Sequence, residues 1–294
     1  MSHDLPPTEA ENEQTGALDT LSTHDLVALL VGEQRCAVDA VLARGHAIAR
    51  AVDEIVERIE AGATLHYVGA GTSGRLAALD AAEMPPTFGT PPELVRAHLA
   101  GGSEALGRSI EGAEDDAVAG AAAIDSCVKP QDVVIGISAS GGAAFVVAAV
   151  ERAKALGART LAVTNVAASP LAGAAHAAIV LDTGPEALSG STRLKAGTAQ
   201  KIALNAISTA VMVRLGKVYG NLMVDVVASN SKLRARALRL VTRLTGVDES
   251  SARELLERAE GRVKVAVVMA RRGLDAPAAR ELLARHRGSL RTLL

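Results

Sequence analysis

Val68-Gly-Ala-Gly-Thr-Ser-Gly74 and Ile135-Gly-Ile-Ser-Ala-Ser-Gly141 are two similar glycine-rich segments from which the fold can be predicted. Each follows a short apolar run and leads into a stretch with helical periodicity. The two loops align residue for residue, with glycine, serine and glycine at equivalent positions. A strand, a glycine-rich turn and a helix that repeat in this way predict βαβ units. The sequence therefore predicts an α/β fold, a doubly wound parallel sheet with helices on both faces.

The chain between residues 61 and 235 continues this alternation. Expected strands cover residues 64–68, 94–99, 132–137, 160–164 and 177–181, and expected helices cover residues 74–82, 103–125 with a break at Gly112, 142–156, 169–175 and 192–215. Consecutive βαβ units place such strands in one parallel sheet. We therefore expect residues 61–235 to form one ligand-binding domain.

The N-terminal segments are expected to lie outside this domain. Residues 1–17 are polar and acidic, and we expect them to form a flexible tail. Residues 18–60 are expected to be helical. Ser22 and Asp25 fit a capping box for a first helix, and the apolar spacing predicts a longer helix over residues 34–60.

The C-terminal part is predicted to be all helical. Strand signals stop after residue 221, and helical patterns cover residues 231–245, 250–260, 263–272 and 276–285. Asp248 and Asp275 stand where an N-cap aspartate accepts first-turn N–H groups. We expect residues 236–294 to form a small helical subdomain.

Composition excludes several classes of protein. The 294 residues include 31 lysines and arginines against 33 aspartates and glutamates, a net charge of −2. This balance argues against nucleic-acid binding, which needs clustered positive charge. Aromatic residues make up only 1% of the chain, too few for a base-stacking platform. No apolar run reaches the roughly 18 residues of a membrane span, and the N-terminus lacks a signal-peptide pattern. We expect a cytoplasmic protein that binds neither nucleic acid nor membrane.

The sequence does not indicate metal or disulfide chemistry. Cys36 and Cys127 are the only cysteines, and no group of cysteines and histidines has the spacing of a zinc site. His66 lies inside an expected strand, and we interpret it as a satisfied core residue rather than a catalyst. The prediction is therefore a protein without metal or cofactor.

The two glycine-rich loops are predicted to bind a phosphate monoester. In a parallel sheet both lie at carboxyl ends of strands, beside helix N-termini whose N–H groups and dipoles favour an anion. The predicted contacts from these two loops are Gly71, Thr72, Ser73, Ser138, Ser140 and Gly141. A third loop over residues 189–201 adds Ser191 and Thr192 with a cation, Arg193 or Lys195, of which Lys195 is the predicted contact. The alternatives are tight turns without a ligand and, for the third loop, an ordinary helix cap.

Gly69, Gly71 and Gly74 also match the G-x-G-x-x-G pattern of dinucleotide sites. Such a site requires an acidic residue about 20 positions later, at the end of the second strand. This chain has Ala97-His98-Leu99 there, without a carboxylate. The second hydroxyl-rich loop also has no role in a dinucleotide site, so a phosphosugar is the favoured ligand.

Two glutamates stand in contrasting places. Glu83 precedes Pro85 and Pro86, which are expected to end the helix there, and a carboxyl at the negative end of a helix dipole favours its protonated form. Glu114 follows Gly112 in the expected first turn of a helical segment, where the dipole favours the anion. Opposed environments of this kind are typical of an acid/base pair. The alternative for Glu114 is a solvated acidic surface run.

Longer motifs resemble the N-acetylmuramic acid 6-phosphate etherase family. They are Leu18-Asp-Thr-Leu-Ser-Thr23, Gly69-Ala-Gly-Thr-Ser-Gly-Arg75, Asp80-Ala-Ala-Glu-Met-Pro-Pro-Thr-Phe-Gly89, Glu111-Gly-Ala-Glu-Asp115, Gly190-Ser-Thr-Arg-Leu-Lys-Ala-Gly-Thr-Ala-Gln-Lys201 and Gly216-Lys-Val-Tyr-Gly-Asn-Leu-Met-Val-Asp225. The resemblance implies a sugar isomerase (SIS) domain, an αβα sandwich that acts as a homodimer. It also implies a lyase that converts N-acetylmuramic acid 6-phosphate to N-acetylglucosamine 6-phosphate and D-lactate, in cell-wall amino-sugar recycling or catabolism.

The family's catalytic roles carry over onto two residues of this chain. The resemblance implies that Glu83 donates a proton to the departing lactate and that Glu114 acts at the C2 proton, which overrides the surface reading of Glu114. It implies elimination followed by water addition, without a cofactor. One stretch departs from the family: Gly142-Ala-Ala-Phe145 stands where the family usually has Arg-Thr-Pro-Tyr, which bears on the second loop's contacts with substrate.

Two other functions are compatible with such a fold. An aldose–ketose isomerase for phosphosugars shares proton removal at C2 but needs no acid for a leaving group at C3, so Glu83 speaks against it. A non-catalytic sugar-phosphate sensor that regulates a partner needs neither Glu83 nor Glu114. The presence of both carboxyl groups favours the lyase.

Overall fold

A computed structural model describes residues 5–226 and 231–294 of the chain. These residues form two compact units. Unit 1 comprises Met1–Ala82 and Glu93–Ser208, and unit 2 comprises Glu83–Pro92 and Thr209–Leu294. The unit boundaries fall inside two long helices, α4 (Gly71–Phe88) and α8 (Lys195–Arg214). The domain boundaries expected at residues 60 and 235 stay a prediction.

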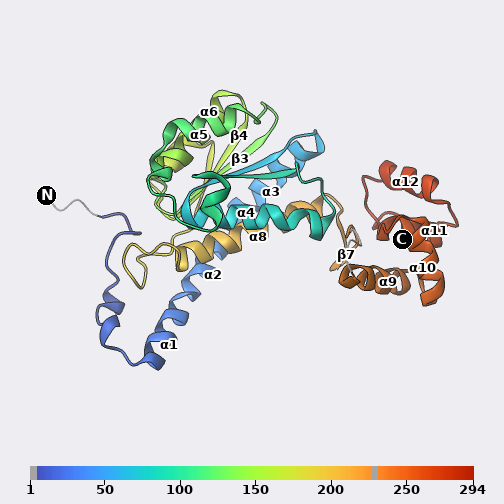
Figure 1. Cartoon of the computed structure of the whole chain (residues 1–294), viewed down its shortest axis with the longest axis horizontal. Helices are drawn as coiled ribbons and strands as arrows, with labels where there is room; N and C mark the ends of the chain where they lie inside the picture. The colour runs from blue at the N-terminus through green and yellow to red at the C-terminus, as the bar shows by residue number, and fades with distance from the viewer. Residues whose placement is uncertain (1–4, 227–230) are drawn as a thin grey trace. The chain divides into compact units, whose positions relative to one another are not determined.

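Unit 1 contains a five-stranded parallel sheet in the order β2-β1-β3-β4-β5, which confirms the predicted α/β class (Figure 1). The strands are β1 (Leu65–Gly69), β2 (Val95–Leu99), β3 (Val133–Ser138), β4 (Arg159–Thr164) and β5 (Ala177–Val180). The chain reverses its direction of travel across the sheet between β1 and β3, so both predicted loops follow adjacent central strands. Ligands of open α/β sheets bind at such a switch point.

Helices cover both faces of this sheet. One face carries α5 (Ala117–Asp125), α6 (Ala144–Ala155) and α7 (Pro170–Ala174), and the other carries α3 (Gly45–Glu60) with α4 and α8 (Figure 1). Alternation along the strands separates two cores. Val68 and Val134 pack with Val146 on the α6 side. Tyr67 projects to the other side, where its hydroxyl donates to Asp80 of α4 at 3.0 Å.

The N-terminal helices differ in part from the expectation. The serine N-cap is confirmed: Ser22 Oγ accepts the Asp25 N–H at 3.2 Å at the start of α1 (Thr23–Glu33). The second half of the expected capping box differs, because the Asp25 carboxylate accepts a hydrogen bond from the Ser22 hydroxyl at 2.6 Å rather than from the Ser22 backbone N–H. The prediction of a single helix over residues 34–60 is wrong, because the chain turns at Ala43 and Arg44 between α2 (Arg35–Leu42) and α3. Apolar spacing continues across this turn, and so the pattern alone does not reveal it.

Two other segments also fold differently from their predicted form. The helix expected over residues 103–125 is replaced by two 3₁₀ turns, η3 (Gly102–Leu106) and η4 (Ala113–Asp115), followed by α5. Part of the segment expected as a flexible tail makes specific contacts. Its 3₁₀ turn η1 (Glu13–Thr15) is followed by η2 (Leu18–Thr20), and Thr15 Oγ1 donates to the Ala187 carbonyl at 2.9 Å.

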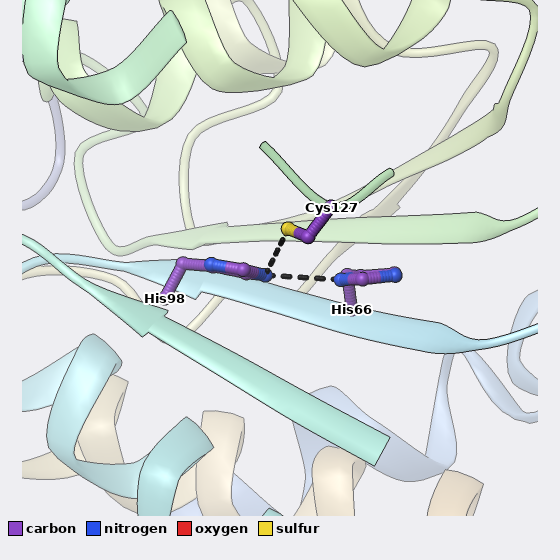
Figure 2. Close-up of side chains that lie close together, drawn as sticks. All are labelled: His66, His98 and Cys127. Atoms are coloured by element: carbon purple, nitrogen blue, oxygen red, sulfur yellow. Dashed lines mark hydrogen bonds between the residues drawn. The ribbon is translucent and has the colours of Figure 1, made fainter. Parts of the chain in front are cut away.

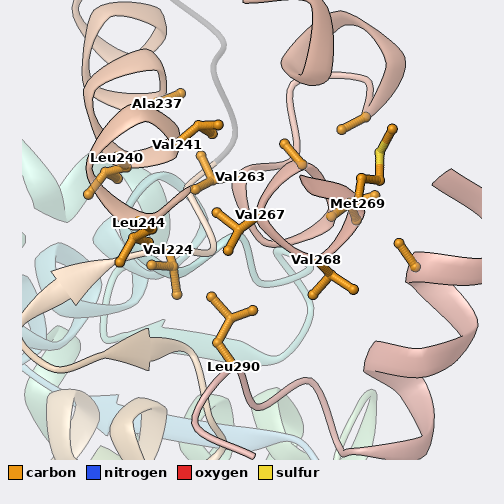
Figure 3. Packing of buried hydrophobic residues seen from close by; sticks show 14 of the residues in the cluster. Val224, Ala237, Leu240, Val241, Leu244, Val263, Val267, Val268, Met269 and Leu290 are labelled. Carbon is orange, nitrogen blue, oxygen red and sulfur yellow. The ribbon is translucent and has the colours of Figure 1, made fainter. Parts of the chain in front are cut away.

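Unit 2 contains the four predicted C-terminal helices, α9 (Ser231–Thr245), α10 (Glu249–Arg258), α11 (Val263–Arg272) and α12 (Ala276–Arg285). Asp248 and Asp275 cap α10 and α12 as expected. The first seven residues of α11, Val263–Met269, are buried, and its valines pack against α9 and Leu290 (Figure 3). A small hairpin, β6 (Val218–Tyr219) and β7 (Leu222–Met223), was not predicted, because two-residue strands carry no readable alternation. In the described part of the chain, no helix is long and apolar enough to cross a membrane.

The contact between α5 and α6 generates a stability prediction. A Cβ atom on Gly120 of α5 would overlap the Phe145 carbonyl of α6, whereas a Cβ on Gly173 of α7 would meet nothing within 4 Å. We expect Gly120→Ala to lower the free energy of unfolding by about 1–3 kcal/mol, as overpacking does. Gly173→Ala, the matched control, should leave it unchanged or raise it by up to about 1 kcal/mol. Urea denaturation followed by circular dichroism measures both, and equal effects would contradict the packing argument.

Candidate active site

The first loop closes tightly onto the helix that follows it. A Cβ atom on Gly69 would lie 2.7 Å from the backbone nitrogen of Gly74, so the end of β1 and the first turn of α4 approach each other without side chains between them. Gly71 has φ +52°, a left-handed value that favours glycine. This geometry brings the N-terminus of α4 to the carboxyl end of β1. First-turn N–H groups and the helix dipole there can receive an anion.

The hydroxyl of Ser73 is already engaged in the protein. It donates to Gln200 Oε1 at 2.7 Å, and Gln200 Nε2 donates in turn to Asn165 Oδ1 at 3.2 Å. Ser73 and Gln200 are both buried, whereas Thr72 is half-buried. The network therefore fixes the first turn of α4 against α8. The sequence analysis did not identify Gln200 as a site residue, although it lies inside the family motif that covers residues 190–201.

The second loop has the same form with different supports. Gly141 has φ +68°, and a Cβ atom there would overlap the Ser169 side chain. Ser138 Oγ accepts the Gly141 N–H at 3.1 Å, and Ser140 Oγ accepts the Gly142 N–H at 3.2 Å. Because each oxygen acts as an acceptor here, each hydroxyl proton can be donated to an anion. The loop then leads into α6 at Ala144.

A cavity of about 330 Å³ opens at the carboxyl ends of β1 and β2. It brings together two of the predicted residues, Gly71 and Glu114. Gly112 starts the 3₁₀ turn η4 with φ +71°, so Glu114 lies in a first helical turn as expected. The residues that line the cavity are Ala70, Gly71, Arg75, Ala100, Ala105, Ser109, Ile110, Glu111, Gly112, Ala113 and Glu114.

Arg75 supports the wall of this cavity. Its Nε donates to the Ala105 carbonyl at 2.8 Å, and one terminal nitrogen donates to the Arg108 carbonyl at 3.0 Å. The guanidinium therefore attaches η3 to α4. The same side chain places a positive charge beside a cavity that also contains Glu111 and Glu114.

Glu83 occupies a different position from the one predicted. The helix does not stop before the prolines: α4 continues through Pro85 and Pro86 to Phe88. Proline has a helical φ, so two prolines near a helix end remove N–H donors without forcing the chain out of the helix. Gly89, with φ +61°, ends α4 and donates its N–H to the Pro85 carbonyl at 2.9 Å. The helix-end argument for Glu83 is therefore wrong, and its side chain is exposed in unit 2.

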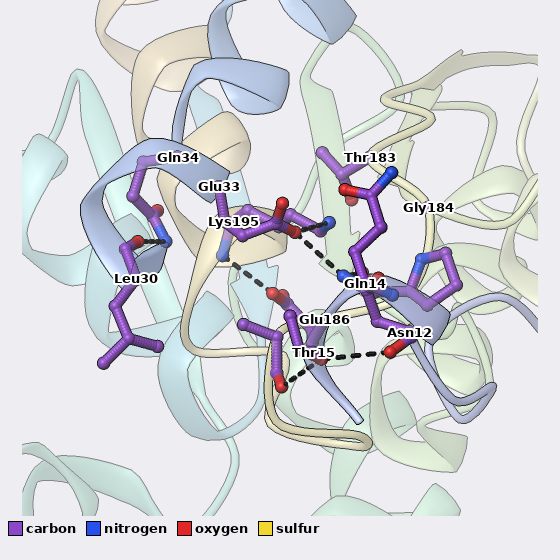
Figure 4. Close-up of polar contacts among 12 residues, drawn as sticks. Asn12, Gln14, Thr15, Leu30, Glu33, Gln34, Thr183, Gly184, Glu186 and Lys195 are labelled. Atoms are coloured by element: carbon purple, nitrogen blue, oxygen red, sulfur yellow. Dashed lines mark hydrogen bonds and ion pairs between the residues drawn. The ribbon is translucent and has the colours of Figure 1, made fainter. Parts of the chain in front are cut away.

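The third loop is organised by carboxylates of the protein itself (Figure 4). The Lys195 and Ala196 N–H groups at the start of α8 donate to Glu186 at 3.0 and 2.9 Å. Lys195 Nζ lies 2.7 Å from Glu33 Oε2 of α1, and the lysine is 4% exposed. Burial raises the pKa of the Glu186 carboxyl, and the two N–H bonds act in the opposite direction. Lys195 thus serves as an ion-pair partner here, while Ser191 and Thr192 are half-buried before the helix.

A buried carboxyl joins the strand before the first loop to the helix after it. Asp80 of α4 accepts hydrogen bonds from Tyr67 of β1 and from Asn205 and Ser208 of α8, at 3.0, 2.6 and 3.0 Å. Burial raises the pKa of Asp80, and these hydrogen bonds oppose that rise. The network joins β1, α4 and α8, and sequence analysis did not identify it.

Comparisons with known proteins agree with this architecture. Residues 47–154 match the N-terminal SIS domain of glucokinase regulatory protein, residues 116–210 match the SIS domain, and residues 220–265 match the C-terminal lid domain of glucokinase regulatory protein. The phosphoheptose isomerase from Francisella tularensis has a similar fold, with a TM-score of 0.51 at 18% identity over 65% of this chain and 97% of that chain.

Curated relatives are much closer in sequence. An N-acetylmuramic acid 6-phosphate etherase of Symbiobacterium thermophilum is 53% identical over 261 residues, 89% of this chain and 87% of that protein. The etherase of Deinococcus radiodurans is 49% identical over 263 residues, 89% of this chain and 86% of that protein. With this identity over nearly the whole length, the chain belongs to the N-acetylmuramic acid 6-phosphate etherase family.

Proposed function

We propose that this protein is a carbon–oxygen lyase that cleaves the lactyl ether of N-acetylmuramic acid 6-phosphate. The observation that carries the proposal is the cavity at the carboxyl ends of β1 and β2, where the first glycine-rich loop meets Glu114. The relatives that share about half of the sequence are named for this reaction. The products are N-acetylglucosamine 6-phosphate and D-lactate.

The phosphate is received by the two glycine-rich loops. The N-terminus of α4 supplies Gly71, Thr72 and Ser73, through backbone N–H groups in the case of Ser73, whose hydroxyl is bound to Gln200. The second loop supplies Gly141 with the hydroxyls of Ser138 and Ser140. Lys195 makes no direct contact in this proposal because Glu33 neutralises it.

The chemistry is an elimination followed by hydration. In the open-chain sugar the aldehyde acidifies the hydrogen at C2, and the Glu114 carboxylate removes that proton. The C2–C3 double bond forms as the C3–O bond breaks, and the Glu83 carboxyl gives its proton to the departing lactate oxygen. Water then adds its oxygen at C3 and a proton returns to C2. The role of Glu83 comes from its family motif, and that of Glu114 from the motif and from its place in the cavity.

Lactate release tests this function. Purified protein given N-acetylmuramic acid 6-phosphate should release stoichiometric D-lactate, measured with a lactate dehydrogenase. The unphosphorylated sugar should react with kcat/KM at least about tenfold lower, because one hydrogen bond to a charged group contributes about 1.5–3 kcal/mol. Equal turnover of both sugars would contradict the phosphate site. Aldose–ketose conversion without lactate would indicate an isomerase, and binding without turnover would indicate a sensor.

Isotope exchange at C2 distinguishes the roles of the two glutamates. Glu83→Gln should block lactate release while solvent deuterium still enters C2, and Glu114→Gln should abolish exchange as well. Each variant should lose about 10²–10⁴-fold in lactate release, as expected for one proton-transfer group. Asp115→Asn, next to Glu114 but outside the cavity lining, is the matched control and should remain active. Proton NMR in D₂O measures exchange; the reverse pattern would exchange the roles, and near-normal release by both variants would rule out the mechanism.

We also infer that the protein is a homodimer joined through its N-terminal helices. Helix α1 is apolar, yet none of its residues is buried in the chain. Val27 and Val31 are 54% and 65% exposed, and Leu42 of α2 is 72% exposed. A second copy that covers this surface would form a two-fold interface, the commonest oligomer.

A pair of charges on α1 tests the dimer. Val27→Asp combined with Val31→Asp should convert the dimer to a monomer at micromolar concentration, because the interface would bury two carboxylates without partners. Analytical ultracentrifugation measures the mass. Val118→Asp on α5, at a valine that is 81% exposed, is the matched control and should leave the dimer intact. A wild-type protein that sediments as a monomer would refute the inference.

A further inference from the structure

Three side chains with metal-binding atoms meet on one face of the sheet in unit 1 (Figure 2). His66 lies on β1, His98 lies on β2, and Cys127 follows α5. His66 Nδ1 is 3.0 Å from His98 Nε2, and Cys127 Sγ is 3.9 Å from the same Nε2. All three donor atoms lie within 4.8 Å of one another. The proposed reaction uses none of these residues.

Strand register brings the two histidines together. His98 pairs with Val68 in the parallel β1–β2 ladder, and His66 lies two residues earlier on β1. Because side chains alternate along a strand, His66 and His98 project from the same face of the sheet. This is the α5 side, where Val68 also packs. Cys127 directly follows Ser126, the C-cap of α5, so the end of this helix places the thiol beside the two imidazoles.

The outer nitrogen of His66 is an unusual feature of this cluster. His66 is fully buried, and its Nε2 has no hydrogen-bond partner among the described residues. Asp132 Oδ2 lies 3.5 Å from that nitrogen, and Asp132 is held in place by the N–H groups of Thr64 and Lys129. A metal-ligating imidazole commonly donates its other ring N–H to a carboxylate. Asp132 lies on that side of His66, but at 3.5 Å it does not accept a hydrogen bond from Nε2.

Both imidazoles are available as neutral ligands. Burial lowers the pKa of His66 to about 4, and the neighbouring His98 acts in the same direction. Burial and the charge of Arg96 lower the pKa of His98. Neutral rings carry an unshared electron pair on one nitrogen, which is the state that binds metal.

We propose that His66 Nδ1, His98 Nε2 and Cys127 Sγ form a site for a Zn²⁺ ion, with water as the fourth ligand. Tetrahedral bonds of about 2.0–2.1 Å to nitrogen and 2.3 Å to sulfur separate nitrogen from nitrogen by about 3.3 Å and nitrogen from sulfur by about 3.6 Å. The observed 3.0 and 3.9 Å differ from these separations by about 0.3 Å each. Binding releases the thiol proton of Cys127, which is now directed at the Ala123 carbonyl at 3.2 Å. It also replaces the hydrogen bond between His66 Nδ1 and His98 Nε2, because the hydrogen on one of these two nitrogens moves to the other nitrogen of its own ring.

The donor set selects the class of ion. Two imidazoles and one thiolate favour zinc and neighbouring transition metals over Mg²⁺ or Ca²⁺, which require oxygen ligands. His98 and Cys127 are half-buried, whereas His66 is fully buried, so the partly exposed side of the cluster is that of His98 and Cys127. The ion would link β1, the edge strand β2 and the end of α5. Its role is therefore to stabilise unit 1 rather than to take part in ether cleavage.

Zinc titration tests the site. Full-length protein, first dialysed against a chelator, is titrated with ZnCl₂ by calorimetry and melted with and without zinc. One Zn²⁺ per chain, proton release and a raised Tm are expected. Cys127→Ser and His98→Gln should each weaken the affinity at least about 100-fold, beyond the usual effect of losing an outer-shell partner. Cys36→Ser, at the exposed cysteine of α2, is the matched control and should bind as the wild type does.

Cobalt supplies an independent readout. Co²⁺ in the site should give a thiolate-to-metal charge-transfer band that disappears in Cys127→Ser and persists in Cys36→Ser. Circular dichroism of the metal-free variants verifies their folding, and His98→Gln supplies the test if Cys127→Ser does not fold. The proposal is overturned if wild-type protein binds no zinc, if binding survives both substitutions, or if the cobalt spectrum lacks the thiolate band.

Discussion

The backbone at the end of β1 passes so close to the first turn of α4 that neither Gly69 nor Gly74 has room for a Cβ atom. A side chain on Gly74 would meet the Gly69 carbonyl at 2.6 Å, and that carbonyl already accepts the Ala100 N–H at 3.0 Å. The contact therefore fixes three things at once: the start of α4, the exit of β2 and the floor of the cavity that contains Glu114. A larger residue at either glycine would displace all of them.

The N-termini of three helices in unit 1 have free N–H groups and a positive dipole end, and these are compensated in different ways. Those of α4 and α6 follow glycine-rich loops at the centre of the sheet, where backbone N–H groups and serine hydroxyls can receive an external anion. At α8 the anion belongs to the protein, because Glu186 accepts the first N–H groups. Lys195 is then paired with Glu33, which attaches α1 to the domain. The same electrostatic preference thus gives two loops that can bind one phosphate together and, at α8, a contact within the protein.

The candidate active site and the buried polar clusters lie at different places on the sheet. The candidate active site occupies the carboxyl ends of β1 and β2, whereas the His66, His98 and Cys127 cluster lies against the α5 face. On the opposite face, Asp80 binds β1, α4 and α8 together through three hydrogen bonds. Buried polar groups therefore contact β1 on both faces of the sheet, and the first loop follows directly from β1. Substituting one of these groups would change the site by shifting the backbone of β1, because none of them lines the cavity.

Four features could be predicted from the sequence: the α/β class, the positions of the two glycine-rich loops, the C-terminal helices with their caps, and the family. These features depend on short-range rules: alternation, helical periodicity, capping side chains and motifs that are contiguous in the chain. The path of α4 through Pro85 and Pro86 was decided by tertiary structure, because proline is compatible with helical φ and the stop came from Gly89. The ion pair of Lys195 with Glu33 joins residues far apart in sequence. The histidine–cysteine cluster has no readable spacing for the same reason: strand register and a helix end bring its three members together, and no local pattern encodes which distant side chains share a buried space.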